Sequence, residues 1–252
     1  MARRLFFGLI ILFAALVLPA CSKSAPPAAE RTTATAPAQP AVNTAERMAD
    51  HFGKVRDLEA AVIRGDLESA RADAQWIADH QETAGLPPGT EVYVMATRNA
   101  ARAVAASTSL GNAGVAAAFA VADCGECHAA AKVTPRLPEA SAPPPAAGTA
   151  ARMFAHQYAV ELMYRGLAAP SDALWKQGAE ALKGSPLTDK EAAKAGTEVV
   201  SFETRVHDLA GRAAQATDTG SKIAIYGELL GGCSGCHAMH GRVLGSGLPK
   251  TS

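Results

Sequence analysis

The amino-acid sequence predicts an all-α protein, on three observations. Aromatic residues make up only 5% of the chain, whereas β-sheets draw heavily on aromatic and β-branched side chains. Alanine is abundant and is accompanied by Leu, Glu, Arg and Lys, which favour helices. Apolar residues also recur at helical spacing along several segments. The 252 residues include 24 basic and 24 acidic ones, and this neutral balance argues against nucleic acid as a partner.

The beginning of the chain has the organisation of an export signal. Two arginines precede an apolar run, residues 5–18, that is too short for a comfortable membrane span. The sequence LPAC at residues 18–21 resembles a bacterial lipobox, in which the cysteine is lipidated and becomes the first residue of the mature protein. Pro19 departs from the usual small residue, so an ordinary secretory signal cut nearby is the alternative. We expect residues 1–20 to be a signal peptide and Cys21 to carry a lipid.

These features predict an exported protein. We expect it in the periplasm of a Gram-negative bacterium, held at a membrane by the lipid anchor on Cys21. The ordinary secretory signal would also export the chain, but without the anchor.

The chain contains an internal repeat, which predicts two similar domains. MADH at residues 48–51 corresponds to MFAH at 153–156, and CGECH at 124–128 corresponds to CSGCH at 233–237. The offset is 105 residues at the first motif and 109 at the second, so the second copy carries a short insertion between its motifs. Duplication is the simplest explanation.

Composition places the boundaries of the two domains. Residues 21–43 are rich in Ala, Pro and Thr and indicate a flexible tether. Residues 132–148 contain a run of prolines and indicate an extended linker, and residues 242–252 indicate a flexible tail. The predicted domains are therefore residues 44–131 and 149–241.

Helix start signals divide each domain into four helices. In the first copy the predicted starts are marked by Asn43, Asp66, Thr90 and Asn112. In the second copy, Ser171 marks the second helix, Thr188 and Glu191 form a capping box for the third, and Asp218 precedes the fourth. Short connections favour antiparallel neighbours, so each copy is expected to form an up-down four-helix bundle.

The CxxCH motif is the attachment signature of c-type haem. A single copy has competing interpretations, such as a redox dithiol or half of a zinc site. Two copies at matching places behind an export signal favour two covalently bound haem c groups, one on the last helix of each bundle. The residues expected to form thioether bonds are Cys124, Cys127, Cys233 and Cys236. His128 and His237 are expected to be the proximal ligands of the two irons.

The position of the motif suggests a family. Here CxxCH lies near the C-terminal end of each copy, which resembles the cytochrome c′ and cytochrome c-556 group, four-helix bundles with haem near one end. The resemblance rests on helix number and motif position and covers most of the mature chain. It implies that the residue facing the open side of the iron comes from the first helix and is Met in the low-spin members.

The repeated histidine of the first motif is the candidate distal ligand. In an up-down bundle the end of the fourth helix lies beside the start of the first, so His51 and His156 are expected to reach the irons of their own bundles. Met48 and Met153 are the alternatives, and absence of a distal protein ligand is a third possibility. His80, His207 and His240 do not recur between the copies, and we expect them at the surface or at helix ends.

Bis-His ligation predicts an electron carrier rather than an enzyme. The leading hypothesis is a periplasmic dihaem cytochrome that passes single electrons between redox partner proteins. One alternative is a five-coordinate, gas-binding protein that resembles cytochrome c′ and binds NO or CO. A dihaem peroxidase is less favoured, because no Arg–His or Glu pair recurs near either haem motif to provide acid–base groups.

Overall fold

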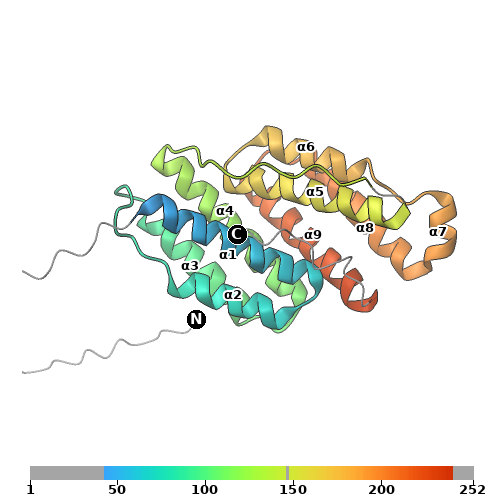
Figure 1. Cartoon of the computed structure of the whole chain (residues 1–252), viewed down its shortest axis with the longest axis horizontal. Coiled ribbons are helices and arrows are strands. Elements are labelled where there is room, and N and C mark those ends of the chain that lie inside the picture. The colour runs from blue at the N-terminus through green and yellow to red at the C-terminus, as the bar shows by residue number, and fades with distance from the viewer. Residues whose placement is uncertain (1–42, 146–147, 241–252) are drawn as a thin grey trace, which may run out of the picture. The chain divides into compact units, whose positions relative to one another are not determined.

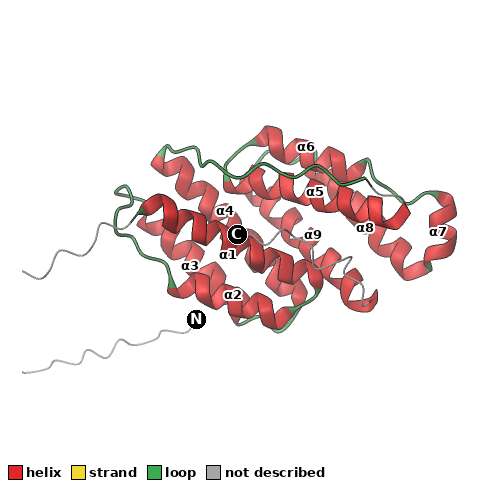
Figure 2. Ribbon diagram, in the orientation of Figure 1, coloured by secondary structure: helices red, strands yellow, loops and turns green. Residues whose placement is uncertain are grey.

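A computed structural model of the chain describes residues 43–145 and 148–240, which belong to one compact unit. These ranges contain nine α-helices and no strand, which confirms the predicted all-α class (Figures 1 and 2). In chain order the helices are α1 (Thr44–Arg64), α2 (Leu67–Asp79), α3 (Glu91–Ala105), α4 (Leu110–Ala131), α5 (Gly148–Ala168), α6 (Asp172–Lys183), α7 (Asp189–Ala195), α8 (Thr197–Ala213) and α9 (Thr219–His240).

The predicted signal peptide, Cys21, the tether and the C-terminal tail lie outside the described residues. Within the described residues, no helix combines the length and the apolar character that crossing a membrane requires.

Most of the predicted helix starts in the first copy are found. The Asn43 side chain accepts hydrogen bonds from the first-turn amides of α1, and the Asp66 side chain accepts one from the Ser69 amide at the start of α2. Gly65 adopts a left-handed conformation, φ 79°, and so lets α1 end directly before that cap. Thr90 precedes α3, but its hydroxyl donates to the Pro87 carbonyl instead of capping the helix.

One expected start is wrong, and another is confirmed but begins a shorter helix than a four-helix bundle requires. Ser109, not Asn112, begins α4, because its extended backbone lets its hydroxyl accept a hydrogen bond from the Asn112 amide. The capping box of Thr188 and Glu191 forms, but it starts the short extra helix α7. The longer helix α8 begins only after Gly196. The second copy therefore has five helices, and α7 lies in the connection where that copy is longer.

Helices α4 and α9, which carry the two CxxCH motifs, form the most extensive helix–helix contact of the described chain. They are antiparallel: Gly111 packs against Gly231, and Val115 packs against Gly227. A Cβ atom on Gly227 would lie 2.8 Å from the Val115 Cα atom, so glycine is needed for this close approach. The two motifs consequently lie toward opposite ends of the helix pair.

The two copies also exchange contacts. Helix α1 packs on α9 as well as on α4, and α5 packs more extensively on α4 than on α9 (Figure 1). Buried side chains from both copies form a single hydrophobic cluster, whose largest fully buried members include Leu58, Met163, Tyr164, Trp175, Tyr226 and Leu229.

Equivalent residues meet where α1 and α5 come together. Arg56 and Glu161 occupy corresponding positions of the repeat, and they form an ion pair with each other. Such a contact is what an approximate two-fold axis between the copies produces. Near it, the Tyr226 hydroxyl of α9 donates a hydrogen bond to Glu59 of α1. Burial raises the pKa of Glu59 to about 8.

Candidate functional site

The first CxxCH motif lies on the C-terminal part of α4. Cys124 and Cys127 are three residues apart and so share one side of the helix. Both thiols are free, and the Cys124 thiol donates to the Ala120 carbonyl at 3.2 Å. Burial raises the pKa of Cys124 to about 12 and also raises the pKa of Cys127. Both side chains are therefore thiols, not thiolates, near neutral pH.

The second motif repeats this arrangement on α9. Cys233 and Cys236 are free thiols, and burial raises the pKa of Cys233 to about 12. The charge of Glu203 adds to the effect of burial at both thiols, so the Glu203 carboxylate lies near this motif.

The histidine of each motif is held by the other copy. The Nδ1 atom of His128 lies 2.8 Å from the Ala168 carbonyl oxygen at the end of α5. The Nδ1 atom of His237 lies 2.6 Å from the Ile63 carbonyl oxygen near the end of α1. Ile63 and Ala168 are equivalent in the repeat, at the offset of 105 residues. Because a carbonyl only accepts, Nδ1 carries the proton in both rings and Nε2 is left as the nitrogen that can bind a metal ion.

The backbone approaches the first motif closely. A Cβ atom on Gly125 would lie 2.0 Å from the Leu167 carbonyl oxygen, so only glycine lets α5 cross α4 here. The equivalent residue of the second motif is Ser234, whose buried side chain donates to the Gly231 carbonyl at 2.8 Å. The second crossing therefore leaves room for a side chain.

His51, the candidate distal ligand of the first copy, lies in an aromatic and apolar setting. Its ring meets the Trp76 ring edge-on, with 5.6 Å between centroids. Burial lowers the pKa of His51, and its buried Nε2 atom has no hydrogen-bond partner in the described parts of the chain. A neutral imidazole with a free nitrogen is the form that binds a metal ion.

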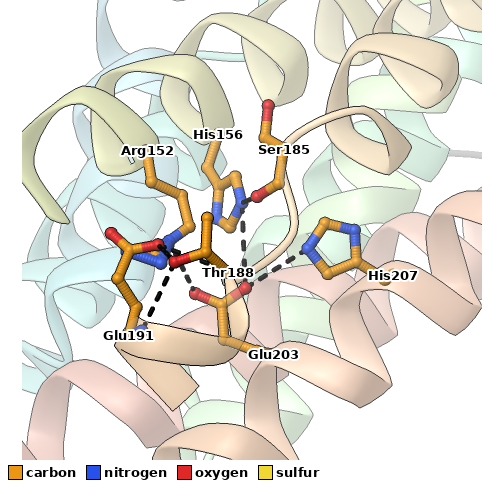
Figure 3. A network of polar contacts seen from close by, with 7 residues as sticks. All are labelled: Arg152, His156, Ser185, Thr188, Glu191, Glu203 and His207. Carbon is orange, nitrogen blue, oxygen red and sulfur yellow. Dashed lines mark hydrogen bonds and ion pairs between the residues drawn. The ribbon is translucent and has the colours of Figure 1, made fainter. Parts of the chain in front are cut away.

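His156, its counterpart in the second copy, lies in a polar cluster (Figure 3). Its Nε2 atom is 3.4 Å from the Ser185 carbonyl oxygen and 3.9 Å from Glu203 Oε2. The same carboxylate oxygen lies 3.3 Å from His207 Nε2. Burial lowers the pKa of His156. Through Glu203, this cluster adjoins the second CxxCH motif.

The two copies therefore differ in what they bring together. In the second, His156, Glu203 and the two thiols lie in one region. No hydrogen bond or ion pair among the described residues joins either histidine directly to its CxxCH motif, and in the first copy Val94 stands at the position of Glu203. Met48 and Met153, the alternative ligands, are half-buried one turn before the histidines.

The expectation for His207 is wrong. Only 17% of its side chain is exposed, and both ring nitrogens are buried. The four-residue spacing of Glu203 and His207 on α8 places them on one side of the helix and is the sequence signal for this pair. The pair does not recur in the repeat, because the first copy has Val94 and Arg98 at the equivalent positions.

His80 agrees with its expected place at a helix end. It caps the C-terminus of α2 and stacks on Trp76 with 4.1 Å between ring centroids. The side chain of His240 lies outside the described residues.

Comparison with known proteins identifies no relative: no family model, no curated protein and no solved structure matches the chain.

Proposed function

We propose that the chain is an exported dihaem c-type cytochrome that transfers single electrons, with one haem attached to each copy of the repeat in a four-helix environment. The observation that carries the proposal is the paired geometry of His128 and His237. Each follows two free thiols on a helix, and each donates its Nδ1 proton to an equivalent backbone carbonyl.

The donor chemistry of these residues fits a c-type haem. Each thiol S–H can add across a haem vinyl group, so that sulfur bonds to one carbon and hydrogen to the other. The carbonyls of Ala168 and Ile63 fix the tautomer and the orientation of the two proximal imidazoles and make Nε2 a better donor. Bound haem supplies a one-electron iron couple whose potential depends on its axial ligands.

His51 and His156 are proposed as the distal ligands, with Met48 and Met153 as alternatives. Both histidines are mostly buried with pKa values lowered by burial, which favours the neutral ring that iron ligation needs. Two imidazole ligands on each iron would close both faces to substrate, which suits electron transfer to redox partner proteins rather than enzymatic turnover.

Haem content, spectra and a redox titration of the purified protein test the core of the proposal. We expect two covalently attached haems per chain, low-spin spectra in both oxidation states, and no rapid binding of CO after reduction. Cys124→Ala with Cys127→Ala should remove one haem, and Cys233→Ala with Cys236→Ala the other. A chain without covalent haem would overturn the proposal. High-spin iron with rapid CO binding would instead support the five-coordinate, gas-binding alternative.

The distal ligands are tested one at a time. His51→Ala should make one haem high-spin, and His156→Ala the other, because each histidine belongs to a different copy. The thioether bonds do not depend on the distal ligand, so both haems should remain attached. Met48→Leu and Met153→Leu are the matched controls and should leave the spectra unchanged. If His51→Ala changes neither spectrum nor potential, Met48 becomes the better candidate for the first copy.

Export and anchoring are part of the same proposal and concern residues outside the described ranges. Mass spectrometry of the mature N-terminal peptide should find a lipid on Cys21. Cys21→Ser should release the protein from the membrane fraction. An unmodified mature N-terminus would contradict the lipid anchor while leaving periplasmic electron transfer untouched.

A further inference from the structure

We propose that His156, Glu203 and His207 form a binding site for a divalent transition-metal cation of the Zn²⁺ type. The site goes beyond the proposed haem chemistry and belongs to the second copy alone. Its ligands come from two helices: His156 from α5, and the pair Glu203 and His207 from one side of α8 (Figure 3).

The spacing of the donor atoms fits one small cation. Each of the three residues offers an atom within 4.8 Å of the others. Glu203 Oε2 lies 3.3 Å from His207 Nε2 and 3.9 Å from His156 Nε2. A tetrahedral ion with bonds of about 2.0 Å needs ligand atoms roughly 3.3 Å apart. Two imidazoles and one carboxylate are also a ligand set that zinc uses in proteins, with water in the fourth position.

In the described part of the chain, buried donor atoms of Glu203 and His207 lack hydrogen-bond partners. His156 Nε2, in contrast, has the Ser185 carbonyl oxygen at 3.4 Å and would exchange that contact for the cation. Glu203 is only 8% exposed, and its Oε2 atom forms no hydrogen bond within the described residues. The same holds for both ring nitrogens of His207. Buried polar atoms normally find a partner, because leaving one unpaired costs about 1–3 kcal/mol. A cation between the three side chains would satisfy Glu203 Oε2 and one ring nitrogen of His207 together.

The balance of charges in the cluster also favours a bound cation. Arg152 lies between two carboxylates: one guanidinium nitrogen is 3.0 Å from Glu191 Oε1, and another is 3.5 Å from Glu203 Oε1. With both imidazoles in the neutral form that metal binding requires, one arginine faces two glutamates. The cluster then carries one net negative charge, shared between the partly exposed Glu191 and the buried Glu203, and this charge favours a cation beside Glu203.

Arg152 occupies the position of an outer partner to a metal-ligating carboxylate. It approaches Glu203 on Oε1, which leaves Oε2 toward the histidines. Ligating carboxylates are commonly held in this way, and loss of the outer partner lowers metal affinity by about 10–100-fold. Glu191 in turn holds Arg152 and is itself part of the α7 capping box.

The first copy supplies a natural control. The first copy has Val94 and Arg98 at the positions of Glu203 and His207. Of the three ligands, only the histidine is common to both copies, as His51 and His156. Changing the second copy to this set, by Glu203→Val with His207→Arg, should abolish the site. Glu203→Gln keeps the shape of the side chain and tests the carboxylate with less risk to folding.

Because His156 is also the proposed distal ligand of the second haem, a cation and the haem iron compete for it. The two roles are separable by experiment, since one is measured as bound metal and the other as the spin state of iron. Occupancy of the cation site should leave the first haem unaffected, because within the described residues the group of three or more close metal-ligating side chains is His156, Glu203 and His207, which does not include His51.

The test titrates Zn²⁺ into the untagged, haem-loaded full chain, with calorimetry, metal analysis after dialysis, and absorption spectra recorded together. We expect one tightly bound Zn²⁺ per chain. Binding should weaken about 10–100-fold in Arg152→Gln. It should be lost in Glu203→Gln and in the double variant, and be unchanged in His80→Gln, which removes an exposed histidine of the first copy. Haem content and helical circular dichroism verify that each variant is folded.

The outcomes separate this proposal from the haem assignment. Zn²⁺ binding that makes one haem high-spin supports both. Binding that is lost in the variants but leaves both haems unchanged supports the cation site and contradicts His156 as a distal ligand. No bound Zn²⁺, or binding that the Glu203 variants retain, overturns the cation site and leaves the proposed electron transfer standing.

Discussion

The two copies of the repeat place equivalent histidines in opposite surroundings. His51 lies against the ring of Trp76. The first copy has Val94 and Arg98 at the positions where the second copy has Glu203 and His207. His156 faces a carboxylate and a second imidazole. The CxxCH histidines, in contrast, have the same partner in both copies, a carbonyl of the opposite first helix. The CxxCH motif and its backbone support are therefore the same in both copies, whereas the surroundings of the other histidine differ.

A pair of equivalent arginines also has different partners in the two copies. The Arg47 guanidinium of the first copy donates to the Ala84 carbonyl at 2.9 Å. Its counterpart Arg152 pairs with Glu191 instead, because the longer connection of the second copy folds into α7 and presents that carboxylate. The arginine thus makes a backbone contact in the shorter copy and an ion pair in the longer one.

The largest expected difference between the copies concerns their tryptophans. Trp175 is 1% exposed and donates from Nε1 to the Ala213 carbonyl at 2.8 Å, whereas Trp76 of the first copy is only half-buried. Trp175→Ala should lower the free energy of unfolding by about 3–5 kcal/mol, because it leaves a large cavity. Trp76→Ala should cost clearly less. Urea denaturation followed by circular dichroism measures both, and equal losses would contradict the comparison.

The two helix crossings at the CxxCH motifs give the second test. Gly125→Ser places a side chain against the Leu167 carbonyl and should destabilise the protein by about 3 kcal/mol, since backbone must move. The reciprocal change, Ser234→Gly, should cost only about 1 kcal/mol, as expected for glycine within a helix. Thermal unfolding of the two variants compares the crossings directly. Similar stability of both variants would show that the two crossings are equally tight.

Glu59 and Tyr164, which occupy equivalent positions, should differ in pH dependence. Burial raises the pKa of Glu59 to about 8, above its ordinary 4.5. The folded protein then holds a proton that the unfolded chain releases, so stability falls as pH rises from about 4.5 to 8. Glu59→Gln should remove this slope and leave the variant more stable than the wild type at pH 8.

Tyr164→Phe is the matched control for Glu59→Gln. Burial raises the pKa of Tyr164 well above 10, outside that range of pH. The slope should therefore persist in this variant. Urea denaturation at a series of pH values measures it, and a slope that survives Glu59→Gln would exclude Glu59 as its source.

The smallest expected effect concerns the caps of the second helix in each copy. Asp66→Ala and Ser171→Ala should each lower stability by about 1 kcal/mol at pH 7. Hydrogen bonds from Ser69 lower the pKa of Asp66. Its contribution is therefore present above pH 3.8 and lost as pH falls through the lowered pKa, whereas the serine cap does not titrate. Denaturation at pH 7 and in strong acid should show a pH-dependent loss only for Asp66→Ala.

Local features of the fold were predictable because they depend on residues close in sequence. Asn43, Asp66 and Ser171 were identified as caps from their type and place, and the structure forms all three. The α7 capping box was also identified, but the separate helix α8 was not predicted; Gly196, with a φ of 79°, divides the two helices. Ser109 and Asn112 are both possible N-caps for α4, and the extended backbone at Ser109 makes it the residue that caps the helix.

The sequence by itself determined the all-α class, the repeat, and two CxxCH motifs on corresponding helices, since composition, periodicity and spacing are properties of neighbouring residues. Only the tertiary structure decided which carbonyls hold His128 and His237, because those carbonyls belong to the opposite copy, 40 and 174 residues away in the chain. It also decided that His207 joins His156. That meeting requires α5 and α8 to pack around a buried carboxylate, and no local pattern records the packing of two distant helices.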